Sequence, residues 1–198
     1  MLKTSFQTKL TEAGCDEAGR GCLAGPVFAA AVIFPHDYKN KELNDSKALN
    51  EKKRESLREQ ILKDAVCYHI ARVEPEEIDK INIHNASYLA MHRALEQLQP
   101  KAEFILVDGN RFIPYGKIPH VCIIKGDMKY LSIAAASILA KTSRDAYMRE
   151  IHEEYPHYDW SRNKGYPTKS HRSAIFQYGS SPYHRSTFKV TDPQLKLL

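Results

Sequence analysis

The stretch CDEAGRGCLAGP, residues 15–26, combines two adjacent acids with three closely spaced glycines. It lies between residues 10–14, which we expect to form a short strand, and residues 27–34 (VFAAAVIF), an apolar run of strand length. Two strands joined in this way form a hairpin. The acids and glycines in its connection indicate that the connection carries chemistry as well as reversing the chain.

The rest of the chain alternates between strand and helix patterns. We expect helices over residues 51–63, 83–98 and 130–151, and strands over residues 66–73, 104–107 and 120–124. The middle of the longest helix, LSIAAASILAK, is rich in alanine, which permits close approach to a sheet. This order predicts an α/β fold with a mixed sheet flanked by helices. We expect a catalytic domain over residues 1–155 and a basic extension over residues 156–198 that packs on it.

Length and composition fit one domain of ordinary size. The 198 residues contain no stretch of about 20 apolar residues that could span a bilayer. The N-terminal segment lacks the apolar core of a secretory signal. The four cysteines form no CxxC pair and no zinc-ligand spacing, so we expect reduced thiols and a cytoplasmic protein.

The positive charge is concentrated near the C-terminus. The whole chain carries a net +5, whereas residues 160–198 hold seven Lys or Arg against one Asp, a net +6. Six aromatic residues lie among these cations. Cations meet phosphates and rings stack on sugars or bases, so this composition is typical of a nucleic-acid surface. A solvated basic tail is the equally simple alternative.

Four acids follow or end expected strands: Asp16, Glu17, Asp108 and Asp127. Acids at strand ends can converge on one rim of a sheet, where a hard divalent ion such as Mg²⁺ offsets their repulsion. Two such ions can hydrolyse a phosphodiester without a Ser or Cys nucleophile, and the chain has no GxSxG, Walker A or HExxH motif. An isolated acid in a turn is usually a cap or turn former, so spacing alone leaves convergence open.

The motifs together resemble those of bacterial ribonuclease HII from about residue 10 to residue 190. The opening signature is residues 15–21 with 23–27. The further matches, in the order of the family, are Asn44-Asp45-Ser46-Lys47, residues 81–86, Val107-Asp108-Gly109-Asn110, Lys125-Gly126-Asp127 with residues 133–141, Lys164-Gly165-Tyr166-Pro167-Thr168, and His184-Arg185 with Phe188.

The resemblance implies a ribonuclease H-like fold with a mainly helical C-terminal extension. It implies hydrolysis of the RNA strand of RNA–DNA hybrids, incision 5′ of single ribonucleotides in duplex DNA, and Mn²⁺ or Mg²⁺ as cofactor. The four acids named above would be the catalytic metal ligands, with Asp145 as the rival of Asp127. We expect Asp145 instead to form a helix-surface ion pair with a neighbouring Arg.

The resemblance also implies substrate contacts. Gly19, Arg20 and Gly21 would read the 2′-hydroxyl and the scissile phosphate through their backbone, and Tyr166 would lie against the sugar on the DNA side of the RNA–DNA junction. Ser46 and Lys47 would hold backbone phosphates; a solvated loop is the alternative for these two residues.

The sequence departs from the family pattern at three places. Cys22 stands where Pro is usual, which would leave an oxidisable thiol near the metals. Ala48 replaces a common second Lys, and the segment after His184-Arg185 has one basic residue fewer, so we expect weaker phosphate binding. None of these changes removes a carboxylate.

The last five residues, Gln194 to Leu198 (QLKLL), resemble short peptides that dock on bacterial sliding clamps. A frayed final turn packed on the domain is the simpler interpretation, and we expect a monomer. Two other functions also stay open. A DNA nuclease of related fold would not need the glycine-rich loop and Tyr166 to find a 2′-hydroxyl, and a non-catalytic binding module would retain acids that repel phosphate.

Overall fold

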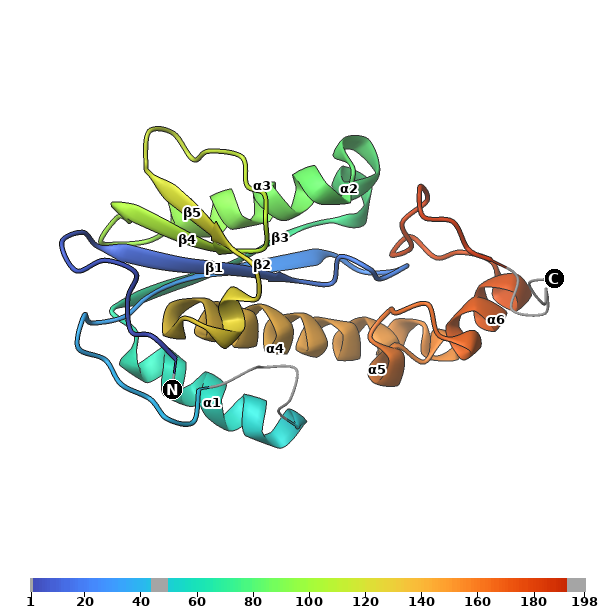
Figure 1. Ribbon diagram of the computed structural model, residues 1–198. Coiled ribbons are helices and arrows are strands. Elements are labelled where there is room, and N and C mark those ends of the chain that lie inside the picture. Colours follow the sequence, from blue (N-terminus) through green and yellow to red (C-terminus); the bar gives the residue numbers. More distant parts are fainter. Residues whose placement is uncertain (1, 44–49, 192–198) are drawn as a thin grey trace.

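A five-stranded sheet forms the centre of the protein, with helices on both faces (Figure 1). The computed structural model describes residues 2–43 and 50–191. The strands are β1 (Glu12–Ala18), β2 (Val27–Ile33), β3 (Cys67–Val73), β4 (Phe104–Asp108) and β5 (His120–Ile123). Their order is β3-β2-β1-β4-β5. The first three strands pair antiparallel, and β1, β4 and β5 pair parallel, which confirms the mixed sheet.

Two layers of helix cover the sheet. Figure 1 shows α2 (Pro75–Ile81) and α3 (Ile83–Glu96) on one face, and α1 (Glu51–Asp64) and α4 (Leu131–Glu154) on the other. The short η1 (Gly126–Met128) precedes α4. After α4 come η2 (Pro156–Tyr158), α5 (Trp160–Asn163) and α6 (Lys169–Tyr178). None of the helices in the described ranges has the length and apolar character that a membrane crossing requires.

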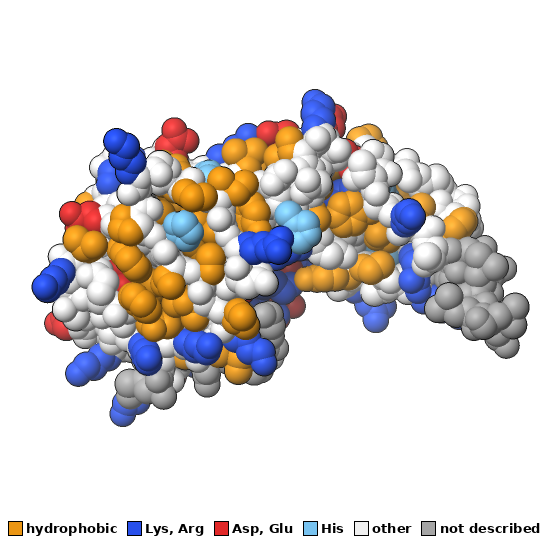
Figure 2. Space-filling view, turned by 45° about the horizontal axis from the view of Figure 1, so that its top comes forward, with side chains coloured by type: hydrophobic (Ala, Val, Ile, Leu, Met, Phe, Trp, Pro, Cys, Tyr) orange, Lys and Arg blue, Asp and Glu red, His pale blue; other side chains and the backbone are white. Residues whose placement is uncertain are grey.

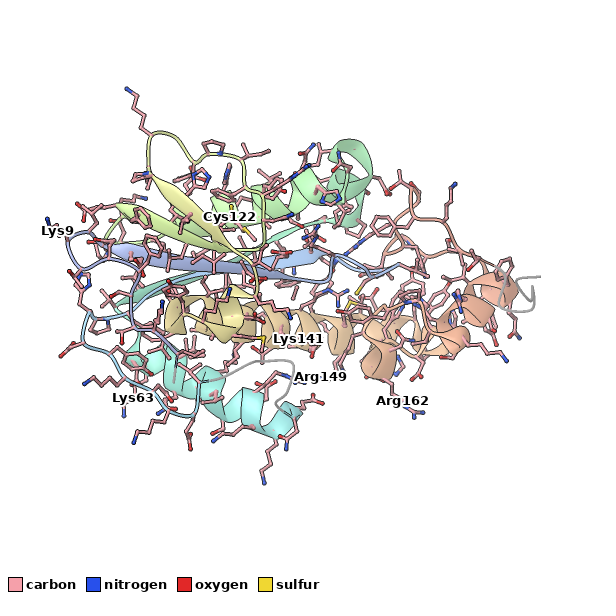
Figure 3. The ribbon with its side chains drawn as sticks, in the orientation of Figure 1. Lys9, Lys63, Cys122, Lys141, Arg149 and Arg162 are labelled. Carbon is pink, nitrogen blue, oxygen red and sulfur yellow. The ribbon has the colours of Figure 1, made fainter. Side chains whose placement is uncertain are left out.

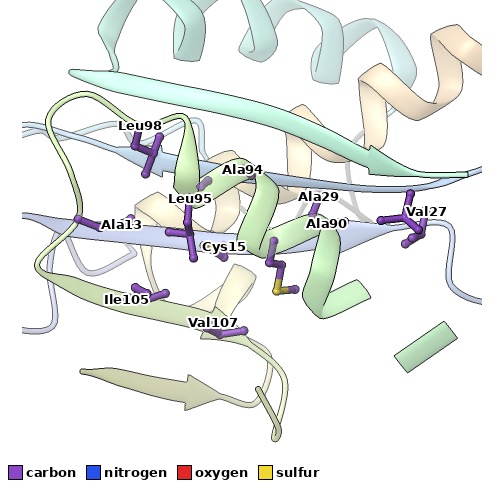
Figure 4. Packing of buried hydrophobic residues seen from close by; sticks show 14 of the residues in the cluster. Ala13, Cys15, Val27, Ala29, Ala90, Ala94, Leu95, Leu98, Ile105 and Val107 are labelled. Carbon is purple, nitrogen blue, oxygen red and sulfur yellow. The ribbon is translucent and has the colours of Figure 1, made fainter. Parts of the chain in front are cut away.

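The apolar run of residues 27–34 forms β2, which is buried along its whole length. Side chains of a strand alternate between faces. Accordingly Ala29 and Ala31 pack in the cluster under α3, whereas Ala30 and Val32 pack in the cluster under α4. Figure 4 shows Ala29 in the first cluster, with Ala90 and Ala94 of α3. Small side chains on both faces let helices approach the sheet closely.

The close approach of α4 depends on Gly14 in β1. A Cβ built on Gly14 would lie 2.4 Å from the Ser132 carbonyl carbon and 2.5 Å from the Ile133 nitrogen, both backbone atoms. To make room for that Cβ, α4 would have to move away from the sheet, and its alanine-rich face would lose its close contact with the strands. This crossing sets where α4 passes behind the acids of β1.

Two expectations about the elements were wrong. The first strand extends from residue 12 to residue 18, so the paired acids lie inside it instead of following it. The ladder with β2 continues to Ala18, which explains the extra length. The helix α2 was not expected; its Pro75 stands at the first helical position, where the missing N–H costs nothing.

The segment after α4 packs on that helix and on the start of the chain. Its apolar cluster joins Trp160, Tyr158 and Ile175 to Met148 of α4 and to Leu23 of the glycine-rich stretch. Figure 1 shows α5 and α6 at one end of the sheet, beyond the strand ends that carry the acids. This packing brings residues near 166 and 185 next to residues 19–25.

Candidate active site

Two adjacent hollows in the surface share the same acids. The first, of about 860 Å³, lies between the start of α3 and the segment after β4, and the second, of about 440 Å³, lies between the glycine-rich stretch and α4. Glu17, Arg20 and Asp108 line both. Figure 2 shows a concave outline between the body of the sheet and the C-terminal part, with Lys and Arg side chains at its margin. The acids therefore stand where the two hollows meet.

The parallel register of β1 and β4 brings two of the expected acids together. Cys15 pairs with Val107, so Asp16 and Asp108 are neighbours at the next position of each strand. Asp16 also hydrogen-bonds Ser137 of α4. Glu17 follows on β1, is almost buried and forms an ion pair with Arg20 at 3.0 Å. A hairpin and a parallel neighbour thus place three carboxylates on one rim.

The environment disfavours the charged form of these acids. Burial raises the pKa of Asp16 well above its usual range, and the nearby carboxylates of Glu17 and Asp108 raise it further. Burial also raises the pKa of Glu17, although the bond from Arg20 opposes this shift. Buried carboxylates that repel one another favour binding of a cation. Hard divalent ions prefer an all-oxygen set of this kind.

The fourth expected acid, Asp127, is 1% exposed in η1. The Gly126 amide, one residue earlier, donates to Asp108 Oδ1 at 2.6 Å, which ties η1 to the end of β4. The structure therefore brings Asp127 near the rim. Asp127 is not among the described residues that line either hollow. In the same ranges, no three Asp, Glu, His or Cys side chains are already arranged to hold an ion by themselves.

The rival acid, Asp145, is bound elsewhere. Lys141, which extends from the middle of α4 (Figure 3), donates to both carboxylate oxygens of Asp145 at 2.5 and 2.7 Å. The expected ion pair exists, but the partner is Lys141 one helical turn earlier and not an Arg. Asp145 is also buried rather than on the helix surface. Lys141 itself lines the second hollow.

The glycine-rich loop has two glycines with different roles. Gly19 has a φ of +97°, and a Cβ there would lie 2.1 Å from Arg144 Nε. Gly21 has no positive φ, and a Cβ there would meet nothing within 4 Å. The chain itself therefore requires glycine at position 19. At position 21 only an approaching ligand could require it.

Tyr166 lines the second hollow and is 42% exposed as a residue. Its backbone is held on both sides: its amide donates to the Asn163 carbonyl at 2.9 Å, and its carbonyl accepts from His171 Nδ1 at 2.9 Å. His171 in turn meets His184, Nε2 to Nε2, at 3.1 Å. A rigid backbone thus presents an exposed ring beside the glycine-rich loop.

Cys22 is fully buried, and this corrects the expectation of an oxidisable thiol. Its exposed fraction is 0%, and burial raises its pKa. The reactive form of cysteine is the thiolate, which both conditions suppress. The small side chain fits where the loop turns back towards residue 165, since the next amide, Leu23 N, donates to the Gly165 carbonyl at 2.8 Å.

Sequence reasoning missed several residues of the hollows. Lys141 and Ser137 belong to a quoted family motif, so only their role was missed. Arg54 carried no signal, because α1 is far from the loop in sequence. His84 belongs to the quoted segment 81–86, and its Nδ1 accepts a hydrogen bond from Arg20 Nη2 at 2.9 Å. The expected phosphate-binding residues Ser46 and Lys47 lie outside the described residues.

Comparison with known proteins identifies the family of the chain. The profile of the ribonuclease HII family matches residues 13–191. Ribonuclease HII of Bacteroides thetaiotaomicron is 62% identical over 198 residues, covering 100% of this chain and 99% of that protein. The ribonuclease HII of Archaeoglobus fulgidus, solved as a complex with PCNA, is 27% identical, with a TM-score of 0.78 over 95% of this chain and 98% of that one.

A more distant structure shares the fold alone. It is a ribonuclease HIII (Bst-RNase HIII) in complex with Mn²⁺, 17% identical, with a TM-score of 0.67 over 93% of this chain and 68% of that one. The family match spans nearly the whole described chain, and the relatives at about 60% identity carry the same name over their full length. The chain therefore belongs to the ribonuclease HII family, the hydrolases that cut the RNA strand of RNA–DNA hybrids.

Proposed function

We propose that this enzyme also incises duplex DNA on the 5′ side of a single embedded ribonucleotide, leaving a 5′-phosphate and a 3′-hydroxyl. The observation that carries the proposal is the junction of the two hollows at Glu17 and Asp108, directly beside the glycine-rich loop. One strand can then pass from one hollow to the other across the acids. The loop lies where it meets the sugar next to the cut.

The donor set fits divalent ions that bind together with substrate. Asp16, Glu17, Asp108 and Asp127 are the proposed ligands, and Mg²⁺ or Mn²⁺ the proposed ions. Mg²⁺ characteristically takes one or two carboxylates and completes its shell with substrate phosphates and water. This accounts for a rim in which no three described donors converge by themselves. Two such ions would supply activation of water and stabilisation of the leaving oxygen.

The protein groups then have separate roles. The acids would hold the divalent ions at the scissile phosphate. The backbone of Gly19, Arg20 and Gly21 approaches the ribose. Tyr166 offers its ring to the next sugar, where deoxyribose fits and a 2′-oxygen would be crowded. Lys141, already neutralising Asp145, is placed to meet a backbone phosphate in the second hollow. The basic segment 156–198 is proposed to bind the rest of the duplex.

A labelled duplex with one ribonucleotide tests the proposal. With Mg²⁺ or Mn²⁺ we expect one cut 5′ of the ribonucleotide on a sequencing gel, no cut without metal, and no cut in an all-DNA duplex of the same sequence. Cleavage of both duplexes would indicate a DNA nuclease of related fold. Cleavage of a long RNA–DNA hybrid with the single-ribonucleotide duplex intact would limit the enzyme to the activity of its family.

The clamp hypothesis is a second proposal. Residues 194–198 lie outside the described residues, and the archaeal relative solved with PCNA supports clamp binding by a member of this family. We expect a peptide of residues 188–198 to bind purified bacterial sliding clamp in the micromolar range, and Leu195→Ala to abolish binding. A scrambled peptide of the same composition is the control. Equal binding of the two peptides would remove the hypothesis.

Two further expectations follow from this function. We expect the enzyme to lie in the cytoplasm of a bacterium, because its proposed substrate is chromosomal DNA. We also expect it to be a monomer. Sedimentation of the free protein at micromolar concentration measures the oligomeric state, and a dimer would contradict the expectation.

A further inference from the structure

Two arginine side chains are buried behind the glycine-rich loop. Arg144 is 1% exposed and Arg185 is 2% exposed. In the described part of the chain, neither forms an ion pair with an acid, and their hydrogen bonds run to backbone carbonyl oxygens. A buried cation without such bonds would be very costly. The two guanidinium groups and the carbonyls around them therefore hold one another in place.

Arg185 binds the carbonyls of the loop itself. Its Nη2 donates to Gly19 O at 2.7 Å, and its Nη1 donates to Arg20 O at 2.9 Å. Its Nε and Nη2 both donate to Gly25 O, at 3.0 and 2.8 Å. One rigid planar group thus fixes two consecutive peptide units and the far end of the same loop.

Fixing a carbonyl also fixes the amide of the same peptide unit. The peptide bond is planar and trans, so its N–H points opposite to its C=O. The unit that starts at Gly19 C=O ends at the Arg20 N–H, and the next unit ends at the Gly21 N–H. Because Arg185 draws both carbonyls towards the interior, both amides point away from it. Neither amide donates to another residue in the described part of the chain.

The second hollow is the space that amides pointing away from Arg185 can reach. Gly19, Arg20 and Gly21 line it together with Asp16 and Tyr166. We propose that Arg185 is a positioning residue for ribose recognition: it aims the Arg20 and Gly21 amides at the 2′-oxygen of the substrate. The inference rests on the proposed function, since it assumes that the loop reads that oxygen. It assigns Arg185 to the choice of sugar, and leaves the carboxylate chemistry unchanged.

Arg144 provides a matched control. It is equally buried and also binds three carbonyls: Pro26 O at 3.1 Å, Lys164 O at 2.8 Å and Ala24 O at 3.0 Å. However, the amides that follow two of these carbonyls already have partners inside the protein. Gly25 N donates to Tyr183 O at 2.8 Å, and Gly165 N donates to Asn163 Oδ1 at 2.8 Å. Loss of Arg144 removes comparable bonds without freeing an amide aimed at substrate.

The experiment measures binding to two duplexes of identical sequence, one all DNA and one with a single ribonucleotide. The full chain carries Asp16→Asn throughout so that neither duplex is cut, and fluorescence anisotropy gives both dissociation constants. Two hydrogen bonds to one hydroxyl are expected to give the parent an about thirtyfold preference for the ribonucleotide. Arg185→Gln should reduce this preference to about threefold or less, whereas Arg144→Gln should keep most of it.

Thermal melting of each variant separates loss of stability from loss of sugar choice. If Arg185→Gln does not fold, Arg185→Lys keeps the cation and can reach one carbonyl, so its preference should fall between that of the parent and unity. An unchanged preference in the folded Arg185 variant would overturn the inference, and so would an equal loss in Arg144→Gln. A parent without preference would overturn the proposed function itself, and the role of Arg185 with it.

Discussion

The contrast between Gly19 and Gly21 yields the sharpest prediction, because the two positions differ in what an added methyl group would meet. At position 19 an alanine would adopt a φ of +97°, which costs a side-chain-bearing residue about 1–3 kcal/mol. Its Cβ would also stand 2.1 Å from Arg144 Nε. Moving that guanidinium sacrifices at least one charged hydrogen bond to a carbonyl, about 1.5–3 kcal/mol each.

The stability loss of Gly19→Ala therefore sums to about 3–6 kcal/mol. For a domain of this size each kcal/mol lowers the melting temperature by about 2–4 °C, so we expect a decrease of at least about 6 °C. Gly21→Ala has no steric conflict within the protein and restricts the unfolded chain, so its melting temperature should stay within about 3 °C of the parent.

Cleavage should show a different pattern from stability. The methyl group of Gly21→Ala would project into the space that a ribose must enter, and a displacement of about 1 Å at a reacting centre costs about a hundredfold in rate. Calorimetry measures the melting temperatures of the two variants, and cleavage of a single-ribonucleotide duplex measures their activity. Near-normal cleavage by Gly21→Ala, or a melting temperature as low as that of Gly19→Ala, would refute the assignment of this loop to the substrate.

Three further predictions concern the acids, the buried histidines and Tyr166. Asp16→Asn should raise the melting temperature in metal-free buffer at pH 7, because it removes a buried carboxylate that Glu17 and Asp108 repel. With Mg²⁺ or Mn²⁺ present, the same change should lower the cleavage rate by about a thousandfold or more. Asp145→Asn is the control: it strands Lys141, should lower the melting temperature, and should retain most cleavage, so a thousandfold loss there would make Asp145 a ligand. Burial lowers the pKa of His184 from 6.5 to about 4, so its neutral form adds stability above pH 6.5 that is lost as the pH falls to about 4. Melting curves over this range should flatten in His184→Gln, and an unchanged slope would exclude His184 as the source. Tyr166→Ala should weaken cleavage at an RNA–DNA junction by about tenfold while Tyr166→Phe retains it, and equal rates for all three proteins would show that the ring does not contact the sugar.

Much of the fold could be predicted from local patterns. The apolar run that became β2 and the alanine-rich run that became α4 each have one dominant environment, which their composition reflects. The end of β1 could not be placed, because residues 15–18 contain the acids and belong to the strand only through the ladder with β2. The helix α2 is seven residues long and has too few apolar positions for its period to be recognised.

The candidate site, like the fold, could be predicted only in part from the sequence. Its acids, glycines and Tyr166 occur in short contiguous motifs, so their identity could be predicted. The partner of Asp145 was expected to be an Arg, whereas the structure selects Lys141, one turn earlier on α4. Arg149, one turn later, pairs with Glu51 of α1 instead. The burial of Cys22 depends on residues 144, 165 and 185, none of which is near it in sequence.

The sequence by itself determined the kind of chemistry, because a glycine loop beside paired acids is written within seven consecutive residues. The tertiary structure decided how those groups are aimed. The parallel pairing of β1 with β4 places Asp16 beside Asp108, and Arg185 reaches back 166 residues to hold the Gly19 carbonyl. Neither relation has a local signature, since a ladder register and a buried cation are satisfied only when distant segments pack around one core.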